Sequence, residues 1–130
     1  MSTYGISSTV IVADASVVID WIDGATDDAL AGYVERRAAA IAPVTITEVL
    51  SGPSVRAAIE EALAAFDVLQ LKVGYWERCG RLRQRMIKHG RKAGLGDVLT
   101  AQACLDHDLP LLARDRDFRA FVELAGLKLA

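Results

Sequence analysis

The 130-residue chain has few of the residues that build disulfide frameworks and zinc clusters. Its two cysteines, Cys79 and Cys104, are too few for a network of disulfides and do not form a CxxC pair. The two histidines, His89 and His107, do not complete a Cys/His zinc cluster at the usual spacings. The sequence therefore excludes a fold held by disulfides or zinc, and it favours reduced thiols inside the protein.

Long apolar runs and targeting signals are also missing. No uninterrupted apolar stretch approaches the roughly 18 residues of a membrane span. Residues 1–9 lack the basic and apolar regions of a signal peptide. We therefore expect a cytoplasmic protein that does not bind a membrane. The length predicts one domain over residues 1–130, with residues 1–9 as an N-terminal extension.

The composition is that of a globular protein with an uneven distribution of charge. Hydrophobic residues make up 52% of the chain and charged residues 25%, which is enough to form a core. The formal net charge is −2, which by itself argues against binding to nucleic acid. Residues 1–70, however, carry three Lys/Arg against ten Asp/Glu, whereas residues 71–130 carry twelve against seven. This asymmetry indicates a charged partner for the basic second half.

Short apolar runs alternate with helical patterns along the chain. Five runs predict strands: 9–13, 40–42, 68–71, 109–113 and 127–129. Helical patterns separate them, the clearest at 73–91, where apolar and basic residues each recur at helical spacing. Polar side chains are expected to begin several helices: Ser16, Asp27, Thr45 or Thr47, Ser54, Asp97 and Asp117. Strands separated by helices predict an α/β fold with a mainly parallel sheet of about five strands.

Five acidic residues follow predicted strands or begin helices near one edge of that sheet: Asp14, Glu48, Asp97, Asp115 and Asp117. Carboxylates that converge in this way repel one another unless a cation neutralises them. Oxygen ligands without cysteine or histidine suit a hard cation such as Mg²⁺ or Mn²⁺, which supports phosphodiester cleavage. Each acid alone is also compatible with helix capping or a solvent-exposed position, so the hypothesis depends on the agreement of all their positions.

Other polar residues support this interpretation. No histidine lies near a strand end to activate Ser16 as a nucleophile, so its hydroxyl is expected to cap the helix or support Asp14. Five basic residues are candidates for guiding a phosphate backbone toward the acids: Arg81, Arg85, Lys88, Arg114 and Arg116. A solvated basic face is the alternative interpretation of Arg81, Arg85 and Lys88.

Four segments together resemble the PIN-domain ribonucleases, and most of all their VapC-type members, the toxins of type II toxin–antitoxin pairs. They are Asp14-Ala15-Ser16-Val17, Thr47-Glu48-Val49, Gly96-Asp97-Val98-Leu99 and Ala113-Arg114-Asp115-Arg116-Asp117-Phe118. The resemblance extends from about Val10 to Leu129. It implies a single three-layer α/β/α domain with a mainly parallel sheet and an endoribonuclease activity that depends on Mg²⁺, with Mn²⁺ as a substitute.

The resemblance also implies roles for individual residues and for partners. The four core acids of the family match Asp14, Glu48, Asp97 and Asp115, which would be catalytic metal ligands. Asp117 matches a frequent fifth acid, and Ser16 a supporting hydroxyl. Ala113 and Val98 differ from the residues that the family often has there, without removing a ligand.

The implied partners are a cognate antitoxin, RNA of the tRNA or rRNA class, and a second copy of the chain in a homodimer. The alternative function is a catalytically silent PIN-like binding or regulatory module. Measurable affinity for Mn²⁺ that is lost on Glu48→Gln would favour the enzyme over the module.

Overall fold

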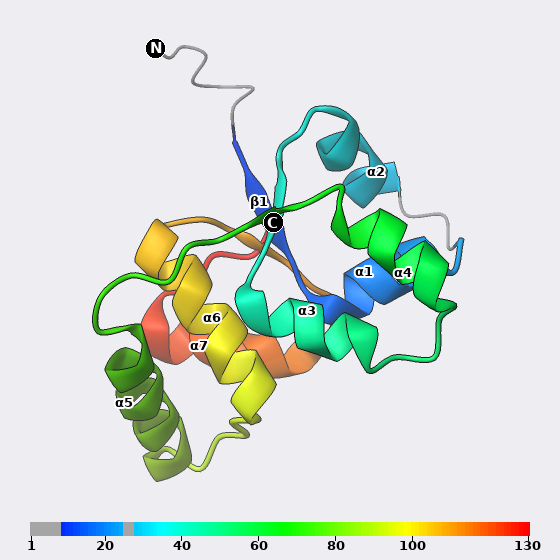
Figure 1. Ribbon diagram of the computed structural model, residues 1–130. Helices are drawn as coiled ribbons and strands as arrows, with labels where there is room; N and C mark the ends of the chain where they lie inside the picture. The colour runs from blue at the N-terminus through cyan, green and yellow to red at the C-terminus, as the bar shows by residue number, and fades with distance from the viewer. Residues whose placement is uncertain (1–8, 25–27) are drawn as a thin grey trace.

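The computed structural model describes residues 9–24 and 28–130, and it contains a four-stranded parallel sheet (Figure 1). The strands are β1 (Ile11–Ala13), β2 (Ala39–Ile41), β3 (Asp67–Val68) and β4 (Leu111–Leu112). Their order across the sheet is β3-β2-β1-β4, and all three pairings are parallel. The predicted α/β fold with a mainly parallel sheet is therefore confirmed. Residues 1–8 of the predicted extension and the predicted helix start at Asp27 lie outside the described residues.

The fifth predicted strand is reduced to an isolated bridge between Leu129 and Leu111. The Leu111 N–H donates to the Lys128 carbonyl at 2.9 Å, and the Ala130 N–H donates to the Leu111 carbonyl at 2.8 Å. The C-terminal segment thus pairs beside β4 through a single residue. The sheet therefore has four strands, close to the predicted number of about five.

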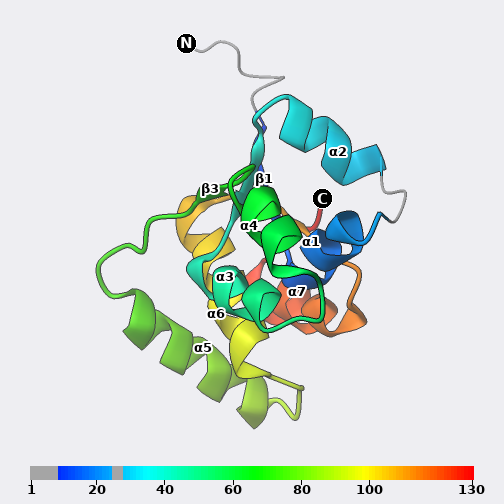
Figure 2. The same ribbon diagram turned by 45° about the vertical axis from the view of Figure 1, so that its right-hand side comes forward.

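Helices cover both faces of the sheet (Figures 1 and 2). They are α1 (Ala15–Ile22), α2 (Asp28–Glu35), α3 (Pro43–Leu50), α4 (Arg56–Leu63), α5 (Tyr75–Lys88), α6 (Leu95–His107) and α7 (Arg119–Ala125), with a 3₁₀ turn η2 (Arg116–Phe118) before α7. Helices α1, α2 and α4 lie on one side, and α5, α6 and α7 lie on the other. In the part of the chain that the structure describes, no helix is long and apolar enough to cross a membrane.

The alternation of side chains along the strands produces two cores, one on each face of the sheet. Val12 packs in a cluster with residues of α5, α6 and α7, including Met86 and Phe121. Its neighbours Ile11 and Ala13 pack on the opposite face with residues of α1, α3 and α4. All three residues of β1 are fully buried, which explains why this strand is a continuous apolar run.

Several helices begin at residues other than those predicted. Asp14, rather than Ser16, is the N-cap of α1, because its carboxylate accepts from the Ser16 N–H. Helix α3 begins at Pro43, whose fixed φ suits a first helical position, so Thr45 is inside the helix and Thr47 is not a cap.

Three further helices begin within two residues of the predicted positions, but other residues cap them. Ser54 does not cap α4; its hydroxyl donates to Asp23 Oδ1 at 2.9 Å. Gly94 is the N-cap of α6, which places Asp97 in the first turn. Asp115 is the N-cap of η2 and accepts from the Asp117 N–H, so Asp117 lies inside that turn.

Helix α5 is held against α6 by a partly buried ion pair in addition to apolar contacts. Arg78 donates to both carboxylate oxygens of Asp106, from Nε at 2.9 Å and from Nη2 at 2.6 Å. Gln102 Nε2 also donates to Asp106 Oδ1 at 2.9 Å. Burial opposes ionisation of Asp106, but these hydrogen bonds outweigh it and hold the pKa of the carboxyl below its usual value. The pair therefore fixes the position of α5 relative to α6.

Candidate metal centre

Asp14 lies at the carboxyl end of the central strand β1 and is held there by its backbone. Its N–H donates to the Leu112 carbonyl at 3.0 Å, which joins the ends of β1 and β4. The strand order is β3-β2-β1-β4, so β2 lies on one side of β1 and β4 on the other. Ligands of open parallel sheets bind at such a switch point in strand order. The Ser16 hydroxyl donates to Asp14 Oδ2 at 2.7 Å, and the side chain of Asp14 is almost fully buried. Ser16 thus orients the Asp14 carboxylate.

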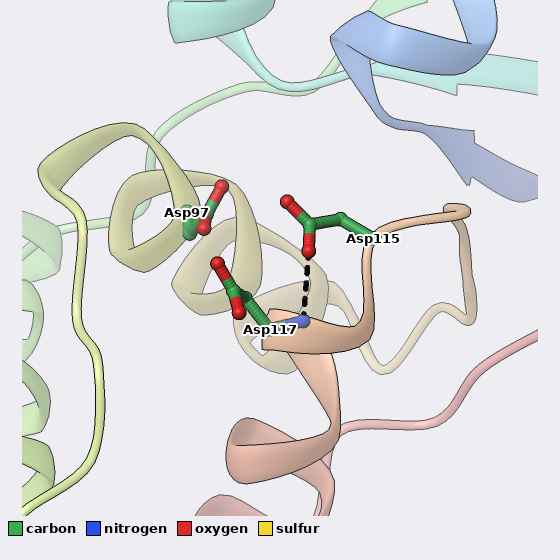
Figure 3. Close-up of side chains that lie close together, drawn as sticks. All are labelled: Asp97, Asp115 and Asp117. Carbon is green, nitrogen blue, oxygen red and sulfur yellow. Dashed lines mark hydrogen bonds between the residues drawn. The ribbon is translucent and has the colours of Figure 1, made fainter.

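Three further aspartates face one another beside this strand end (Figure 3). Asp97 comes from the first turn of α6, Asp115 from the loop after β4, and Asp117 from η2. One carboxylate oxygen of each lies within 4.8 Å of those of the other two. Asp115 Oδ1 also accepts from the Asp117 N–H at 2.9 Å, which fixes the orientation of Asp115. Three carboxylates from two separate segments are therefore held within the reach of one cation.

Glu48 approaches the same group from α3. Burial raises the pKa of its carboxyl above the usual value, and the charges of Asp14 and Asp97 raise it further. Its Oε1 atom is buried and has no hydrogen-bond partner. A buried carboxylate oxygen without a partner is costly, and a cation or a proton would offset that cost. The effect of Asp14 and Asp97 on the pKa of Glu48 indicates that Glu48 lies close to both of them.

Burial and the neighbouring acids both affect the ionisation of Asp97. Burial, followed by the charges of Asp14, Asp115 and Asp117, raises the pKa of its carboxyl from 3.8 to about 6. Lys92 opposes this shift, and its Nζ lies 3.2 Å from Asp117 Oδ2. The five acids predicted from the sequence thus form one electrostatic cluster, although their roles as ligands stay predictions. Lys92 was not among the predicted site residues, and only its helical spacing from Lys88 indicated it.

The raised pKa of Asp97 predicts a pH effect on the stability of the metal-free protein. The folded state holds this proton between pH 3.8 and about 6, where the unfolded chain has released it. The contribution of Asp97 to the free energy of unfolding therefore falls as the pH rises through that window. In EDTA, we expect the urea midpoint of Asp97→Asn to rise relative to wild type between about pH 4 and about pH 7.

The matched control for this measurement is Asp108→Asn, at the opposite end of α6. Asp108 has an exposed side chain paired with Lys128 at 2.9 Å, so its removal leaves the acidic cluster unchanged. This variant reports the effect of a carboxylate-to-amide change outside the acidic cluster over the same pH range. An Asp97→Asn difference that stays constant from pH 4 to pH 7, or shrinks, would contradict the assigned environment.

The donor set suits a hard divalent cation. All five side chains offer carboxylate oxygens, which Mg²⁺ and Mn²⁺ prefer, and neither cysteine nor histidine contributes. The unpartnered Glu48 oxygen supplies an acceptor that no protein group satisfies. The residues present therefore fit the metal that the sequence predicts.

The predicted basic residues differ in whether their charge is free to bind a phosphate. Arg81, Arg85 and Lys88 are exposed on α5, and no ion pair joins them to an acid within the described residues. Arg114 forms an ion pair with Asp20, so part of its charge is already neutralised. Arg116 is exposed in η2, directly between Asp115 and Asp117.

Comparisons with known proteins agree with this architecture. The sequence profile of the PIN domain family matches residues 11–124. No curated protein matches the sequence significantly. Among solved structures, VapBC2 from Rickettsia felis, bound to a DNA fragment from its promoter, is similar with a TM-score of 0.75 and 15% identity, over 94% of this chain and 98% of that one.

Two other solved structures give the same result. VapBC-1 from nontypeable Haemophilus influenzae has a TM-score of 0.74 at 16% identity, over 94% of this chain and 97% of that one. VapBC-5 from Mycobacterium tuberculosis, a member of the VapBC family of toxin–antitoxin systems, has a TM-score of 0.66 at 23% identity, over 93% and 97%. At these identities the similarity shows a shared fold.

Proposed function

The chain belongs to the PIN domain family, and on that premise we propose that it is a metal-dependent endoribonuclease that acts as a VapC-type toxin. One observation carries the proposal: Asp97, Asp115 and Asp117 each place a carboxylate oxygen within 4.8 Å of the other two. Glu48 and Asp14 adjoin them: the charge of Asp14 raises the pKa of both Glu48 and Asp97. Such a concentration of negative charge is stable when a cation occupies it.

The metal ion would be held by Asp14, Glu48, Asp97, Asp115 and Asp117. When bound, Mg²⁺ or Mn²⁺ lowers the pKa of water and stabilises negative charge that develops on a phosphodiester. The protein contributes the fixed positions of the ligands. Ser16 holds Asp14 through its hydroxyl, and the Asp117 N–H holds Asp115. These hydrogen bonds come from the protein itself and fix the orientation of two of the proposed ligands.

The proposed substrate is RNA, whose phosphates would be attracted by the exposed basic residues. Arg81, Arg85 and Lys88 form one face of α5, and the exposed Arg116 lies between Asp115 and Asp117 in the sequence. These charges would offset the repulsion between a polyanion and the acids. Binding through phosphates weakens with added salt, so RNA affinity should fall as salt is raised. Structured RNAs of the tRNA and rRNA class are the first substrates to test.

A cognate antitoxin and a homodimer complete the proposed system. The M. tuberculosis protein that shares this fold is a member of a toxin–antitoxin family. An antitoxin would inhibit by placing an apolar helix in a groove of the toxin and a basic side chain among the acids. A basic side chain in that position would replace the cation electrostatically.

The decisive experiment is cleavage of purified tRNA and rRNA by the purified protein. We expect cleavage with Mg²⁺, its loss in EDTA, and its recovery when Mn²⁺ is added in excess, since the carboxylates accept either ion. Sequencing of the RNA ends identifies the cleavage sites. Equal cleavage in Mg²⁺ and in EDTA would indicate a contaminating nuclease. No cleavage under any condition, together with no binding of Mn²⁺ in calorimetry, would leave the silent binding module as the function.

A further inference from the structure

Gly96 occupies a position where any side chain would collide with Glu48. It is the second residue of α6, one position before Asp97. A Cβ atom at residue 96 would lie 2.6 Å from Glu48 Oε2 and 3.4 Å from Glu48 Cδ. Non-bonded carbon and oxygen atoms do not approach to 2.6 Å without a shift of one of them. The observed position of the Glu48 carboxylate therefore requires the absence of a side chain at residue 96.

The backbone does not need glycine at this position. Among the described residues, the glycines with positive φ are Gly24, Gly74, Gly90 and Gly126, and Gly96 is not one of them. It has a helical conformation, in which alanine is the better helix former. Glycine at residue 96 thus costs helix stability, and the space for Glu48 is what it provides in return.

A methyl group at residue 96 would move the Glu48 carboxylate rather than the helices. The three nearest heavy atoms to the added Cβ all belong to the Glu48 carboxylate, which ends a flexible side chain. Helix α3 itself is anchored by Thr45 and Val49, which are fully or almost fully buried. No hydrogen bond holds Glu48 Oε1 in its place. The carboxylate is therefore the part that yields.

We propose that Gly96 is a positioning residue: its missing side chain leaves the slot from which the Glu48 carboxylate reaches the acidic cluster. The inference rests on the proposed function, because the purpose of the slot is to place a fifth carboxylate near Asp97. The contact between a side chain at residue 96 and the Glu48 carboxylate does not depend on a metal, so it can be tested in EDTA.

Gly80 provides a matched control. It lies inside α5, where an added Cβ meets no heavy atom within 4 Å. Gly80→Ala therefore gains helix propensity without a collision. Gly96→Ala makes the same replacement in the first turn of α6 and adds the collision with Glu48, so Gly80→Ala shows the effect of the replacement where no collision occurs.

The first experiment measures urea unfolding in EDTA, with Gly96→Ala made in the wild-type and in the Glu48→Ala backgrounds. We expect Gly96→Ala to raise the urea midpoint in the Glu48→Ala background, as Gly80→Ala does in wild type. In the wild-type background Gly96→Ala should give a smaller rise or a fall, because the collision is present there. An equal shift of the urea midpoint in both backgrounds would show that residue 96 and Glu48 do not collide, and would contradict the proposal.

The second experiment measures Mn²⁺ affinity by calorimetry on the same folded variants. We expect Gly96→Ala to weaken binding by at least about tenfold, while Gly80→Ala stays within about twofold of wild type. In a Glu48→Asp background, whose carboxylate ends one methylene earlier, Gly96→Ala should weaken binding much less than in wild type. Unchanged Mn²⁺ affinity in Gly96→Ala would overturn the positioning role.

The two experiments separate failure of the inference from failure of the proposed function. If wild-type protein does not bind Mn²⁺, the proposed metal-dependent function fails, and the unfolding data in EDTA alone decide on the slot. If wild type binds Mn²⁺ and Gly96→Ala binds it equally well, the function stands and the role of Gly96 is wrong.

Discussion

Asp14→Asn should lower the rate of metal-dependent RNA cleavage on the order of 1000-fold, which corresponds to about 4 kcal/mol of transition-state stabilisation. Asparagine keeps the size of the side chain and an oxygen that can accept from Ser16, so the cap of α1 survives. It removes the negative charge at the carboxyl end of the central strand, where the proposed ligands meet. The loss should therefore appear in cleavage and in Mn²⁺ affinity, without unfolding of the protein.

The control for Asp14→Asn is the same change of carboxylate to amide at Asp108. That residue is the C-cap of α6, about 16 Å along the helix from Asp97. Its φ of 52° is a conformation that asparagine accepts. Asp108→Asn should keep its cleavage rate within about twofold of wild type, since Asp108 is highly exposed. If Asp14→Asn cleaved RNA as fast as this control, Asp14 would have no part in the reaction.

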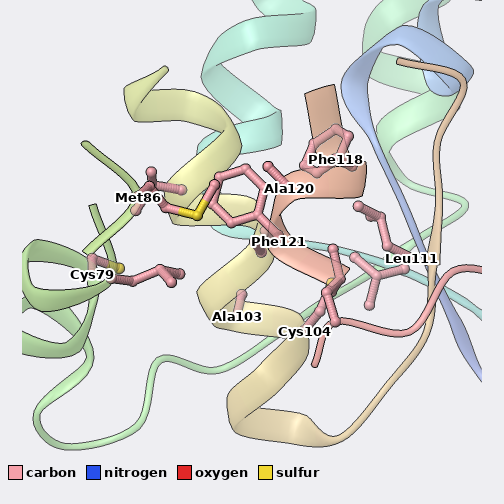
Figure 4. Packing of buried hydrophobic residues seen from close by; sticks show 14 of the residues in the cluster. Cys79, Met86, Ala103, Cys104, Leu111, Phe118, Ala120 and Phe121 are labelled. Carbon is pink, nitrogen blue, oxygen red and sulfur yellow. The ribbon is translucent and has the colours of Figure 1, made fainter. Parts of the chain in front are cut away.

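Phe121→Ala is expected to lower the free energy of unfolding by about 3 to 5 kcal/mol. Phe121 is fully buried in the core beneath α7, among Met86, Cys104 and Leu111 (Figure 4). Its ring also packs against Phe118, with centroids 5.9 Å apart and planes tilted by 43°. Alanine removes this apolar area from the core and leaves a cavity between α5, α6 and α7, which the helices can fill only in part.

Urea denaturation followed by circular dichroism measures this effect, with Val122→Ala as the control. Val122 is the next residue of α7 and is 37% exposed, so its truncation should cost about 1 kcal/mol or less. Because η2 precedes α7 directly, Phe121→Ala should also make the position of Asp117 less fixed. A loss in Phe121→Ala no greater than in Val122→Ala would show that the core on this face is not packed as described.

The fold class could be predicted from the sequence because burial on both faces leaves a clear pattern. The run at Ile11–Ala13 is apolar without alternation, as a central parallel strand requires. Helix starts were predicted poorly because several polar side chains near each start could accept the same hydrogen bonds. Asp14 competes with Ser16, and the sequence alone does not show which of them faces the free amides.

The convergence of the acids could also be predicted, because parallel strands end at one edge of the sheet. Asp14 and Asp115 follow adjacent strands, so topology alone brings them together. Tertiary contacts between distant residues could not be predicted from the sequence. The collision between position 96 and Glu48 depends on how closely α3 and α6 pack, and the ion pair of Arg114 with Asp20 joins residues 94 positions apart. No local sequence pattern indicates either contact.

Helix α5 carries its apolar and basic residues on separate stripes, and this division has an evolutionary consequence. Tyr75, Cys79, Leu82 and Met86 are buried and attach the helix, while Arg81, Arg85 and Lys88 face solvent. Substitutions on the outer stripe leave the core and the acids unchanged. If the chain is the proposed ribonuclease, descendants of one ancestral gene can acquire different preferences for RNA by altering this stripe, while each keeps the same acidic cluster.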